Sequence, residues 1–221
     1  MLTIADSVEK IINDSPYLEE ALRSGLINLS SLARHIQTEV EGRTKKTVKT
    51  GAIIMALKRL SSSIKKKNTQ LTELFSNLGD MTVRSNLVEY TFANSDSLID
   101  KQRHLYHSLQ DSKEIFFNVS TGVYETTVII SKRAEKELQK VFKDEKLNSR
   151  FDNLSSITIM LPPDNVTIPG IYYTILKFLA WRNINLIEAF STANEMTLFF
   201  TEENIEKAFA VLKGIKSEIR Q

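Results

Sequence analysis

The 221-residue sequence contains no cysteine, only seven glycines and no long apolar run. Without cysteine there are no disulfides, no thiolate metal sites and no cysteine nucleophile. Dinucleotide-binding fingerprints and Walker loops need glycines two to five positions apart, whereas the closest two glycines here are nine positions apart. Enzymes built on those phosphate-binding loops are therefore excluded, and no G-x-S-x-G nucleophile elbow can be drawn either.

Targeting signals are also lacking. The N-terminus, MLTIADSVEK, carries Asp6 and Glu9 where a secretory signal would have basic and then apolar residues. Nowhere do 18 apolar residues run together, so no membrane-spanning helix is expected. The composition, 42% hydrophobic and 25% charged, is that of a folded soluble protein with one or two domains, and the lack of cysteine fits a reducing cytoplasm, where we expect the protein.

Residues 1–68 are predicted to form a helical domain. Ser15 and Pro16 start a first helix that stops at Gly25, and a second runs from Asn28 toward Gly42. A third helix follows Thr47, with an apolar stripe at i, i+4, i+7 and i+11 formed by Ile53, Leu57, Leu60 and Ile64. Three short helices with glycine-bearing turns resemble a helix-turn-helix core.

The charge is unevenly distributed between the two parts of the chain. The overall balance is +2, but residues 1–68 hold 12 basic and 7 acidic side chains, which leaves 17 and 20 for the rest. A basic helical domain that can approach phosphate predicts DNA as a possible partner. The alternative is a solvated lysine-rich helix end. The candidate nucleic-acid-binding residues are Arg43, Lys45, Lys46, Thr47, Lys49, Lys58 and Lys65.

The polar segment 61–79 is the expected boundary, and beyond it the pattern changes to β-α-β-β-α, twice. The first copy comprises a strand at Val83 and 87–92, a helix at 97–110, strands at 114–120 and 123–130, and a helix at 133–143. The second comprises a strand at 157–161, a helix at 171–179, strands at 184–186 and 196–200, and a helix at 205–215. A shift of 70 positions aligns Glu125-Thr126-Thr127-Val128 with Glu195-Met196-Thr197-Leu198, which suggests two related modules.

The second copy resembles an ACT domain of the kind found in the regulatory half of aspartate kinases. The resemblance lies in Pro169-Gly170-Ile171 at a helix start, in the turn Asn183-Ile184-Asn185-Leu186-Ile187 and in the final "EKA…VL" helix. It implies an α+β fold, a helix-turn-helix-like domain followed by two ferredoxin-like βαββα ACT modules. We place the domains at 1–68, at 80–145, a degenerate ACT-like module, and at 153–221, an ACT domain. The resemblance also implies a homo-oligomer.

The family also implies a small effector, often an amino acid. Pro169 costs no hydrogen bond at a helix start, Gly170 permits close approach, and free amides of the first turn favour a carboxylate. The ammonium group would need acceptors, for which Asp164, Asn165, Thr167 and Asn185 are available. The alternative is a simple Pro-Gly turn. The predicted effector-binding residues are Asp164, Asn165, Thr167, Pro169, Gly170, Ile171 and Asn185, while Asn94-Ser95-Asp96-Ser97 replaces Pro-Gly in the first copy.

No active site is predicted, and the protein is expected not to be an enzyme. The residues before the first module are too few for the catalytic domain of an aspartate kinase. Asp100, His104, His107 and Asp111 fall on one helical face, but leucines on the opposite face are expected to pack on the sheet. We therefore expect that face to be solvated, with no metal and no cofactor bound.

Three functions remain open at this point. The first is a regulator whose tandem ACT sensor binds an amino acid and controls a DNA-binding N-terminal domain. The second is a detached, aspartate-kinase-like regulatory subunit that docks on a metabolic enzyme. The third is a dimerisation module with no ligand.

Overall fold

The structure is a computed structural model that describes residues 2–110, 112 and 114–218, without the side chains of residues 65–70 and 216–218. The chain forms two compact units, Met1–Glu73 and Leu74–Gln221. None of the helices in this described part combines the length and the apolar character needed to cross a bilayer.

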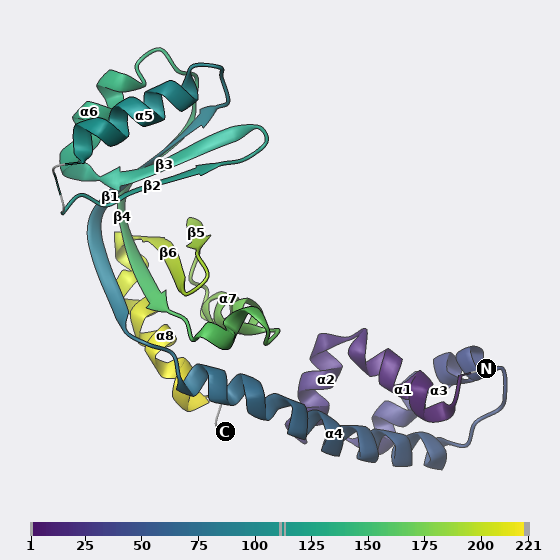
Figure 1. Cartoon of the computed structure of the whole chain (residues 1–221). Helices are drawn as coiled ribbons and strands as arrows, with labels where there is room; N and C mark the ends of the chain where they lie inside the picture. The colour runs from purple at the N-terminus through teal and green to yellow at the C-terminus, as the bar shows by residue number, and fades with distance from the viewer. Residues whose placement is uncertain (1, 111, 113, 219–221) are drawn as a thin grey trace. The chain divides into compact units, whose positions relative to one another are not determined.

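The first unit is helical, as predicted. Its helices are α1 (Ile4–Asn13), α2 (Pro16–Arg23), α3 (Leu29–Thr44) and α4 (Thr50–Ser76), whose last residues belong to the second unit (Figure 1). Ile53, Leu57 and Ile64 of the predicted stripe are buried in a core with residues from all four helices. The sequence analysis missed α1, which begins at a capping box between Thr3 and Asp6. The boundary between the two units falls after Glu73, inside the polar segment 61–79, but that segment is helical as far as Ser76.

The second unit is mixed α+β and contains one antiparallel sheet. The strands of the sheet are β1 (Met81–Ala93), β2 (Phe117–Thr121), β3 (Glu125–Ser131), β4 (Leu147–Met160), β5 (Glu188–Ser191) and β6 (Glu195–Thr201). Across the sheet they lie in the order β2-β3-β1-β4-β6-β5. Its helices are α5 (Leu98–Leu109), α6 (Glu135–Val141), α7 (Ile171–Trp181) and α8 (Ile205–Glu218), with 3-10 turns η1 (Lys132–Ala134), η2 (Pro163–Val166) and η3 (Glu202–Asn204). The predicted order β-α-β-β-α therefore occurs twice.

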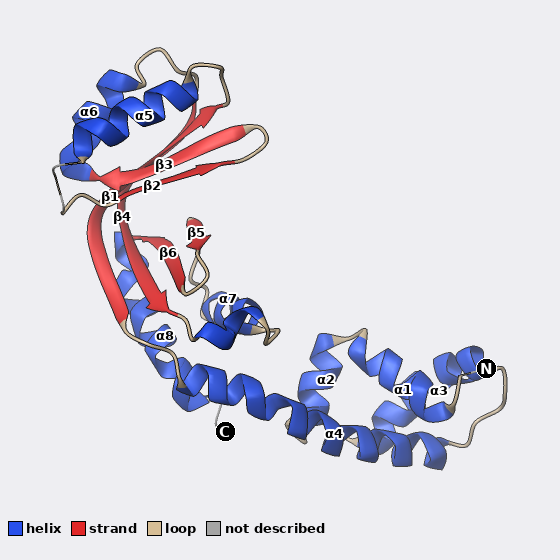
Figure 2. Cartoon of the chain, viewed as in Figure 1, coloured by secondary structure: helices blue, strands red, loops and turns tan. Residues whose placement is uncertain are grey.

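The two copies share their longest strands. Residues 87–93 of β1 pair with β3, whereas 154–160 of β4 pair with β6, and β1 and β4 pair with each other over most of their length (Figure 2). We call the β2-β3 side with α5 and α6 the first lobe, and the β6-β5 side with α7 and α8 the second lobe. Each lobe takes its fourth strand from the long strand that opens the other copy, an exchange that the sequence did not reveal.

Helices cover only one face of each lobe. In the first lobe Val88, Tyr90 and Phe92 of β1 pack with Leu105 and Leu138 of the helices. The opposite faces of the two lobes turn toward each other, because Phe116, beside edge strand β2, lies 5.9 Å from Phe199 of β6 between ring centroids. A seam cluster of Leu87, Ile129, Leu154 and Phe199 therefore joins the lobes.

Equivalent hydrogen bonds show how closely the copies match. The hydroxyls of Thr91 and Thr127 lie 3.0 Å apart across β1 and β3, and those of Thr158 and Thr197 lie 2.9 Å apart across β4 and β6. The 70-residue shift read from the sequence thus pairs the same positions on β3 and β6. One strand was misplaced: β5 spans Glu188–Ser191, not 184–186.

Candidate effector site

The loop between β4 and α7 carries five of the seven predicted effector residues, and a sixth, Ile171, opens α7 directly after it. Asp164 and Thr167 are exposed, and the Thr167 hydroxyl donates to the carbonyl of Asp164 at 2.9 Å. Pro169 is exposed as well, and Ile171 is buried at the start of α7. The loop therefore brings these residues together in front of one helix.

Asn165 has a structural role in the loop in addition to the acceptor role predicted for it. Its side chain is buried, and its Nδ2 donates to the carbonyls of Pro162 at 2.8 Å and Ala193 at 2.7 Å. Both amide hydrogens are thus used to hold η2 against the hairpin between β5 and β6. Asn165 therefore shapes the loop through its amide hydrogens, and its Oδ1 stays a predicted acceptor beside the exposed carboxylate of Asp164.

The start of α7 has the backbone that the Pro-Gly pair predicts. Gly170 is the N-cap residue and has a φ of 104°, a left-handed conformation that favours glycine. In the described chain α7 has no acidic residue in its first turn. Free amides at a helix start favour an anion, so this end of α7 can accept the carboxylate of a ligand.

Asn185 does not belong to this site. It is exposed and follows the C-terminal end of α7, whereas Gly170 caps the N-terminal end. An 11-residue helix is about 16 Å long. The prediction failed because it placed Asn185 on a strand beside the loop, and that segment is a connection leading to β5. Asn183, just before it, does take the predicted left-handed conformation, with a φ of 54°.

The first lobe fills the corresponding position from its own chain. Glu145, in the connection from α6 to β4, accepts hydrogen bonds from Ser95 at 2.7 Å and Ser97 at 2.6 Å, and pairs with Lys101 at 2.8 Å. Ser97 is the N-cap residue of α5. An internal carboxylate therefore sits beside the start of the first helix in this lobe. Sequence reasoning missed Glu145, since nothing in the run Lys143-Asp144-Glu145-Lys146 distinguishes it from a solvated turn.

The surroundings of Glu145 stabilise its ionised carboxylate. Burial raises the pKa of the Glu145 carboxyl, but hydrogen bonds from Lys101, Ser97 and Ser95 outweigh it and lower the pKa to about 2. The second lobe has aliphatic Ile215 at the position 70 residues further on. The two lobes therefore differ in whether the chain itself supplies a carboxylate near the first helix.

The basic residues of the first unit lie mainly in the α3–α4 connection. Lys45, Lys46, Thr47 and Lys49 are exposed there, and Lys58 is exposed on α4. The connection is fixed from α3, because Gln37 donates to the carbonyl of Val48 at 2.9 Å and the Glu41 carboxylate accepts from the Val48 amide at 2.9 Å. Thr47 thus precedes α4, as predicted, and lies in the connection between the two helices.

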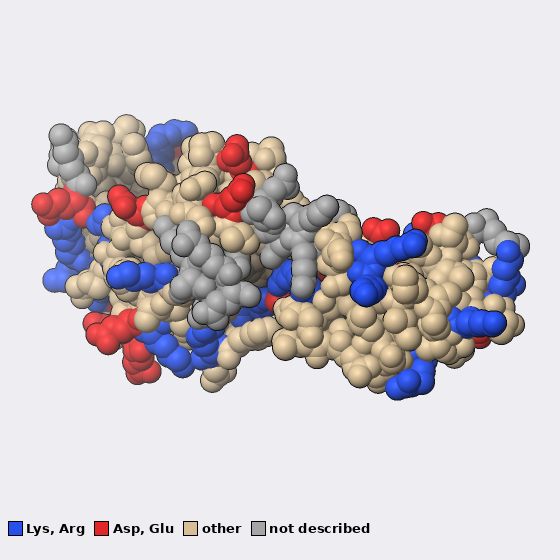
Figure 3. All heavy atoms as spheres, turned by 90° about the horizontal axis from the view of Figure 1, so that it is seen from below, with Lys and Arg blue, Asp and Glu red and all other residues tan. Residues whose placement is uncertain are grey.

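Arg43 and Lys65 differ from the other candidate nucleic-acid-binding residues. The Arg43 guanidinium pairs with Glu39 at 2.7 Å and Asp14 at 3.3 Å, so its charge is balanced within the unit. The side chain of Lys65 lies outside the described residues. On the visible face of this unit in Figure 3, basic groups are separated by uncharged surface.

The predicted solvent exposure of the two histidines on α5 is confirmed. His104 and His107 are exposed, and Leu105 is fully buried on the opposite face. Asp100 pairs with Arg103 at 3.2 Å, and Asp111 lies outside the described residues. Among the residues that the structure describes, no group of three or more His, Asp or Glu side chains is arranged to hold a metal ion.

Comparison with known proteins shows which solved structures the fold resembles. No family model matches the sequence, and no curated protein matches it. The structure is similar to aspartate kinase from Clostridium acetobutylicum, with 14% identity, a TM-score of 0.51, and 62% of this chain and 34% of that chain covered. It is also similar to the ligand-free regulatory subunit of aspartate kinase from Thermus thermophilus, with 8% identity, a TM-score of 0.50, and 62% and 97% covered.

These similarities concern the fold. The chain spans about a third of the length of the Clostridium enzyme but matches almost all of the Thermus regulatory subunit. An ACT-like fold is thereby supported. The helix-turn-helix character of the first unit is not confirmed, and the number of ACT modules stays a prediction.

Proposed function

We propose that this chain is a non-catalytic regulatory protein whose second unit is a tandem ACT sensor for an amino acid. The observation that carries this proposal is the contrast between the lobes. Glu145 supplies a carboxylate beside the start of α5, whereas the first turn of α7 has no acidic residue within the described chain. The amino acid's carboxylate takes the place at α7, and Asp164 receives its ammonium group.

The experiment is a thermal-shift panel of the amino acids on the full chain, followed by calorimetric titration of any amino acid that stabilises it. Asp164→Lys is expected to weaken binding at least ten-fold, because it replaces an attractive charge with a repulsive one. Asp96→Lys is the matched control, since Asp96 is exposed in the corresponding loop of the first lobe. Equal losses in both variants, or no stabilisation by any amino acid, would contradict the proposal.

We also infer that two copies associate through the second lobe. Tyr172, Tyr173 and Leu176 are all at least 40% exposed and lie on one side of α7, an apolar surface of the kind that marks protein contacts. Leu176→Glu is expected to convert a dimer to a monomer in light scattering coupled to size-exclusion chromatography. Ile99→Glu is the control, because Ile99 is an exposed aliphatic residue on the first helix of the other lobe. A monomeric parent protein would refute the inference.

For the output of the regulator, similarity to a regulatory subunit favours docking on a metabolic enzyme. A second candidate output is DNA binding by the first unit, favoured by exposed Lys45, Lys46, Lys49 and Lys58 near the start of α4. Binding to duplex DNA that weakens as salt rises would support the DNA-binding output. No binding at low salt would exclude DNA and leave enzyme docking.

A further inference from the structure

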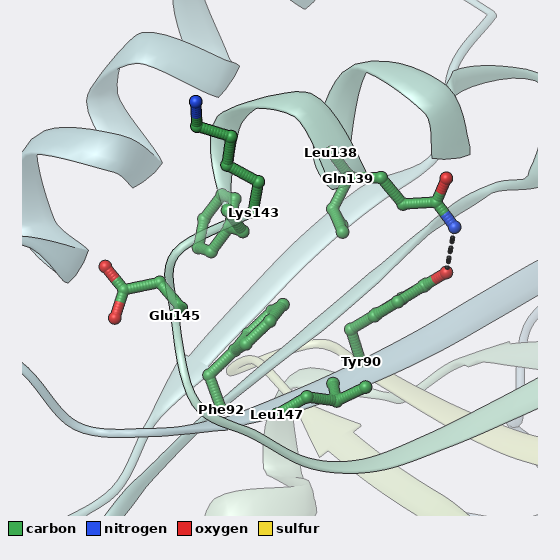
Figure 4. Close-up of a pocket in the computed structure, with 8 residues that line it drawn as sticks. Tyr90, Phe92, Leu138, Gln139, Lys143, Glu145 and Leu147 are labelled. Carbon is green, nitrogen blue, oxygen red and sulfur yellow. Dashed lines mark hydrogen bonds between the residues drawn. The ribbon is translucent and has the colours of Figure 1, made fainter.

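The first lobe contains a small cavity between α6 and the edge formed by the first part of β4. Its volume is about 150 Å³, and Figure 4 shows Phe92 near its centre with Leu138 on one side and Leu147 below. It is lined by Tyr90, Phe92, Leu138, Gln139, Phe142, Lys143, Glu145 and Leu147. Apolar cavities of this volume accept a group the size of benzene.

Comparison of the lobes explains why this space is open. Phe142 and Lys143 correspond to Leu212 and Lys213 under the 70-residue shift. α6 ends at Val141, whereas α8 continues past these positions to Glu218 and places Ile215 in the interior at 1% exposure. The first lobe has Glu145 at this point. The aliphatic group that closes the second lobe is therefore missing from the first.

Glu145 does not fill the gap. Its carboxylate points away from Phe92 in Figure 4 and is committed to Ser95, Ser97 and Lys101. The chemistry that would complete the lobe is accordingly an apolar group of a few carbons, as isoleucine provides in the second lobe.

The polar groups at the rim select the rest of the ligand. The Tyr90 hydroxyl donates to Glu135 at 2.6 Å and accepts from Gln139 at 2.7 Å and Arg150 at 2.8 Å, so it is saturated. Lys143, in contrast, has no ion-pair or hydrogen-bond partner within the described part of the chain. Lys143 therefore supplies a positive charge, unpaired among the described residues, beside the cavity; its ammonium points away from Phe92 in Figure 4 and must turn back to meet a bound ligand.

We propose that this cavity binds a small carboxylic acid with an aliphatic or aromatic tail. The tail lies on Phe92, Leu138 and Leu147, and the carboxylate pairs with Lys143. This site is separate from the proposed effector site on α7, so either can fail without the other.

The test uses 4-methylpentanoate and its neutral counterpart 4-methylpentanamide, titrated into methyl-labelled full-length protein and followed by NMR. Saturable shifts of the Leu138 and Leu147 methyl signals are expected with both compounds. Leu147→Trp, which puts a large ring into an exposed edge position, is expected to abolish the saturable shifts at Leu138. Shifts that never saturate, or that persist unchanged in Leu147→Trp, would overturn the proposal.

The surface variant Lys143→Gln tests the charge without endangering the fold. It is expected to weaken the carboxylate about two- to five-fold, the range of an exposed ion pair, and to leave the amide unchanged. Lys136→Gln is the matched control, because Lys136 is exposed on α6 but does not line the cavity. Equal effects of the two glutamine variants would show that Lys143 does not contact the ligand.

Discussion

Asn86 on β1 and Asn153 on β4 occupy corresponding positions 67 residues apart, and both have a positive φ, 57° and 53°. Each lies at a register shift where its strand has one more residue than its partner, and the leucines that follow them, Leu87 and Leu154, pair with each other. Such bulges bend a strand and increase its twist. The two asparagines therefore mark the point where the sheet passes from one lobe to the other.

Valine at the Asn86 position is expected to destabilise the second unit by about 1–2 kcal/mol, because the left-handed backbone is costly for a residue with a branched Cβ. Glycine is expected to stay within about 1 kcal/mol of the parent. The measurement is urea unfolding of the full chain followed by circular dichroism. Thr82→Val is the control, at an exposed position of β1 without a positive φ. Equal costs at positions 82 and 86 would show that the bulge imposes no constraint.

Glu89 gives the seam between the lobes a pH dependence. It is 4% exposed on the face that carries Leu87, and its Oε2 has no hydrogen-bond partner within the described chain. Burial, together with the negative charge of Glu188, raises the pKa of the Glu89 carboxyl from 4.5 to about 7, against a smaller opposing hydrogen bond from Thr91. The folded protein therefore binds a proton more tightly than the unfolded chain.

The stability that this proton contributes is fully present below pH 4.5 and is lost as the pH rises to about 7. We expect the parent protein to lose up to about 3 kcal/mol relative to Glu89→Gln between pH 4.5 and 8. Urea unfolding of both proteins across this range measures the difference. Glu145 and Asp152, whose pKa values are lowered to about 2, stay ionised throughout, and the histidines are common to both proteins. Parallel pH profiles would rule out this role for Glu89.

Asn165→Ala is expected to destabilise the effector loop, because two buried hydrogen bonds, to Pro162 and Ala193, are lost at a cost of about 1–3 kcal/mol. Amino-acid binding should weaken because the loop that carries Asp164 loses its support. Asn148→Ala removes only an exposed hydrogen bond, to Glu125, far from the effector loop in the sequence, and serves as the control. Urea unfolding measures the stability of both variants, and calorimetry measures their affinity for the amino acid. Unchanged affinity in Asn165→Ala would show that the loop does not shape the site.

The spacing of apolar residues predicted those helices and strands that bury one face in a core. The stripe with Ile53 and Leu57 and the alternation of Met196, Leu198 and Phe200 both correspond to buried positions. The first part of β4, residues 147–153, was missed because it pairs only with β1 and is mostly exposed, so its sequence lacks an apolar alternation. Strand exchange between the lobes is a tertiary property that local patterns do not encode.

The candidate site was predictable only where chemistry is local. The backbone preferences of Pro169 and Gly170 predict a helix start, and the positive φ of Gly170 in the structure agrees with that prediction. Burial of Asn165 and recruitment of Glu145 depend on contacts with residues 28 and 50 positions away. Neither spacing has a sequence signature.

Two basic residues near the α3–α4 connection can distinguish the effect of net charge on DNA binding from the effect of a direct phosphate contact. Arg43 and Lys46 are three positions apart, but Arg43 is held by Glu39 and Asp14, whereas Lys46 is exposed. If the first unit binds DNA, Lys46→Gln should remove one phosphate contact and reduce the slope of log affinity against log salt by about 0.9. Arg43→Gln removes the same formal charge from an existing ion pair and should leave the slope unchanged. Fluorescence anisotropy with labelled duplex at several salt concentrations measures both slopes. Equal slopes in the two variants would mean that net charge, and not a phosphate contact from this connection, governs binding.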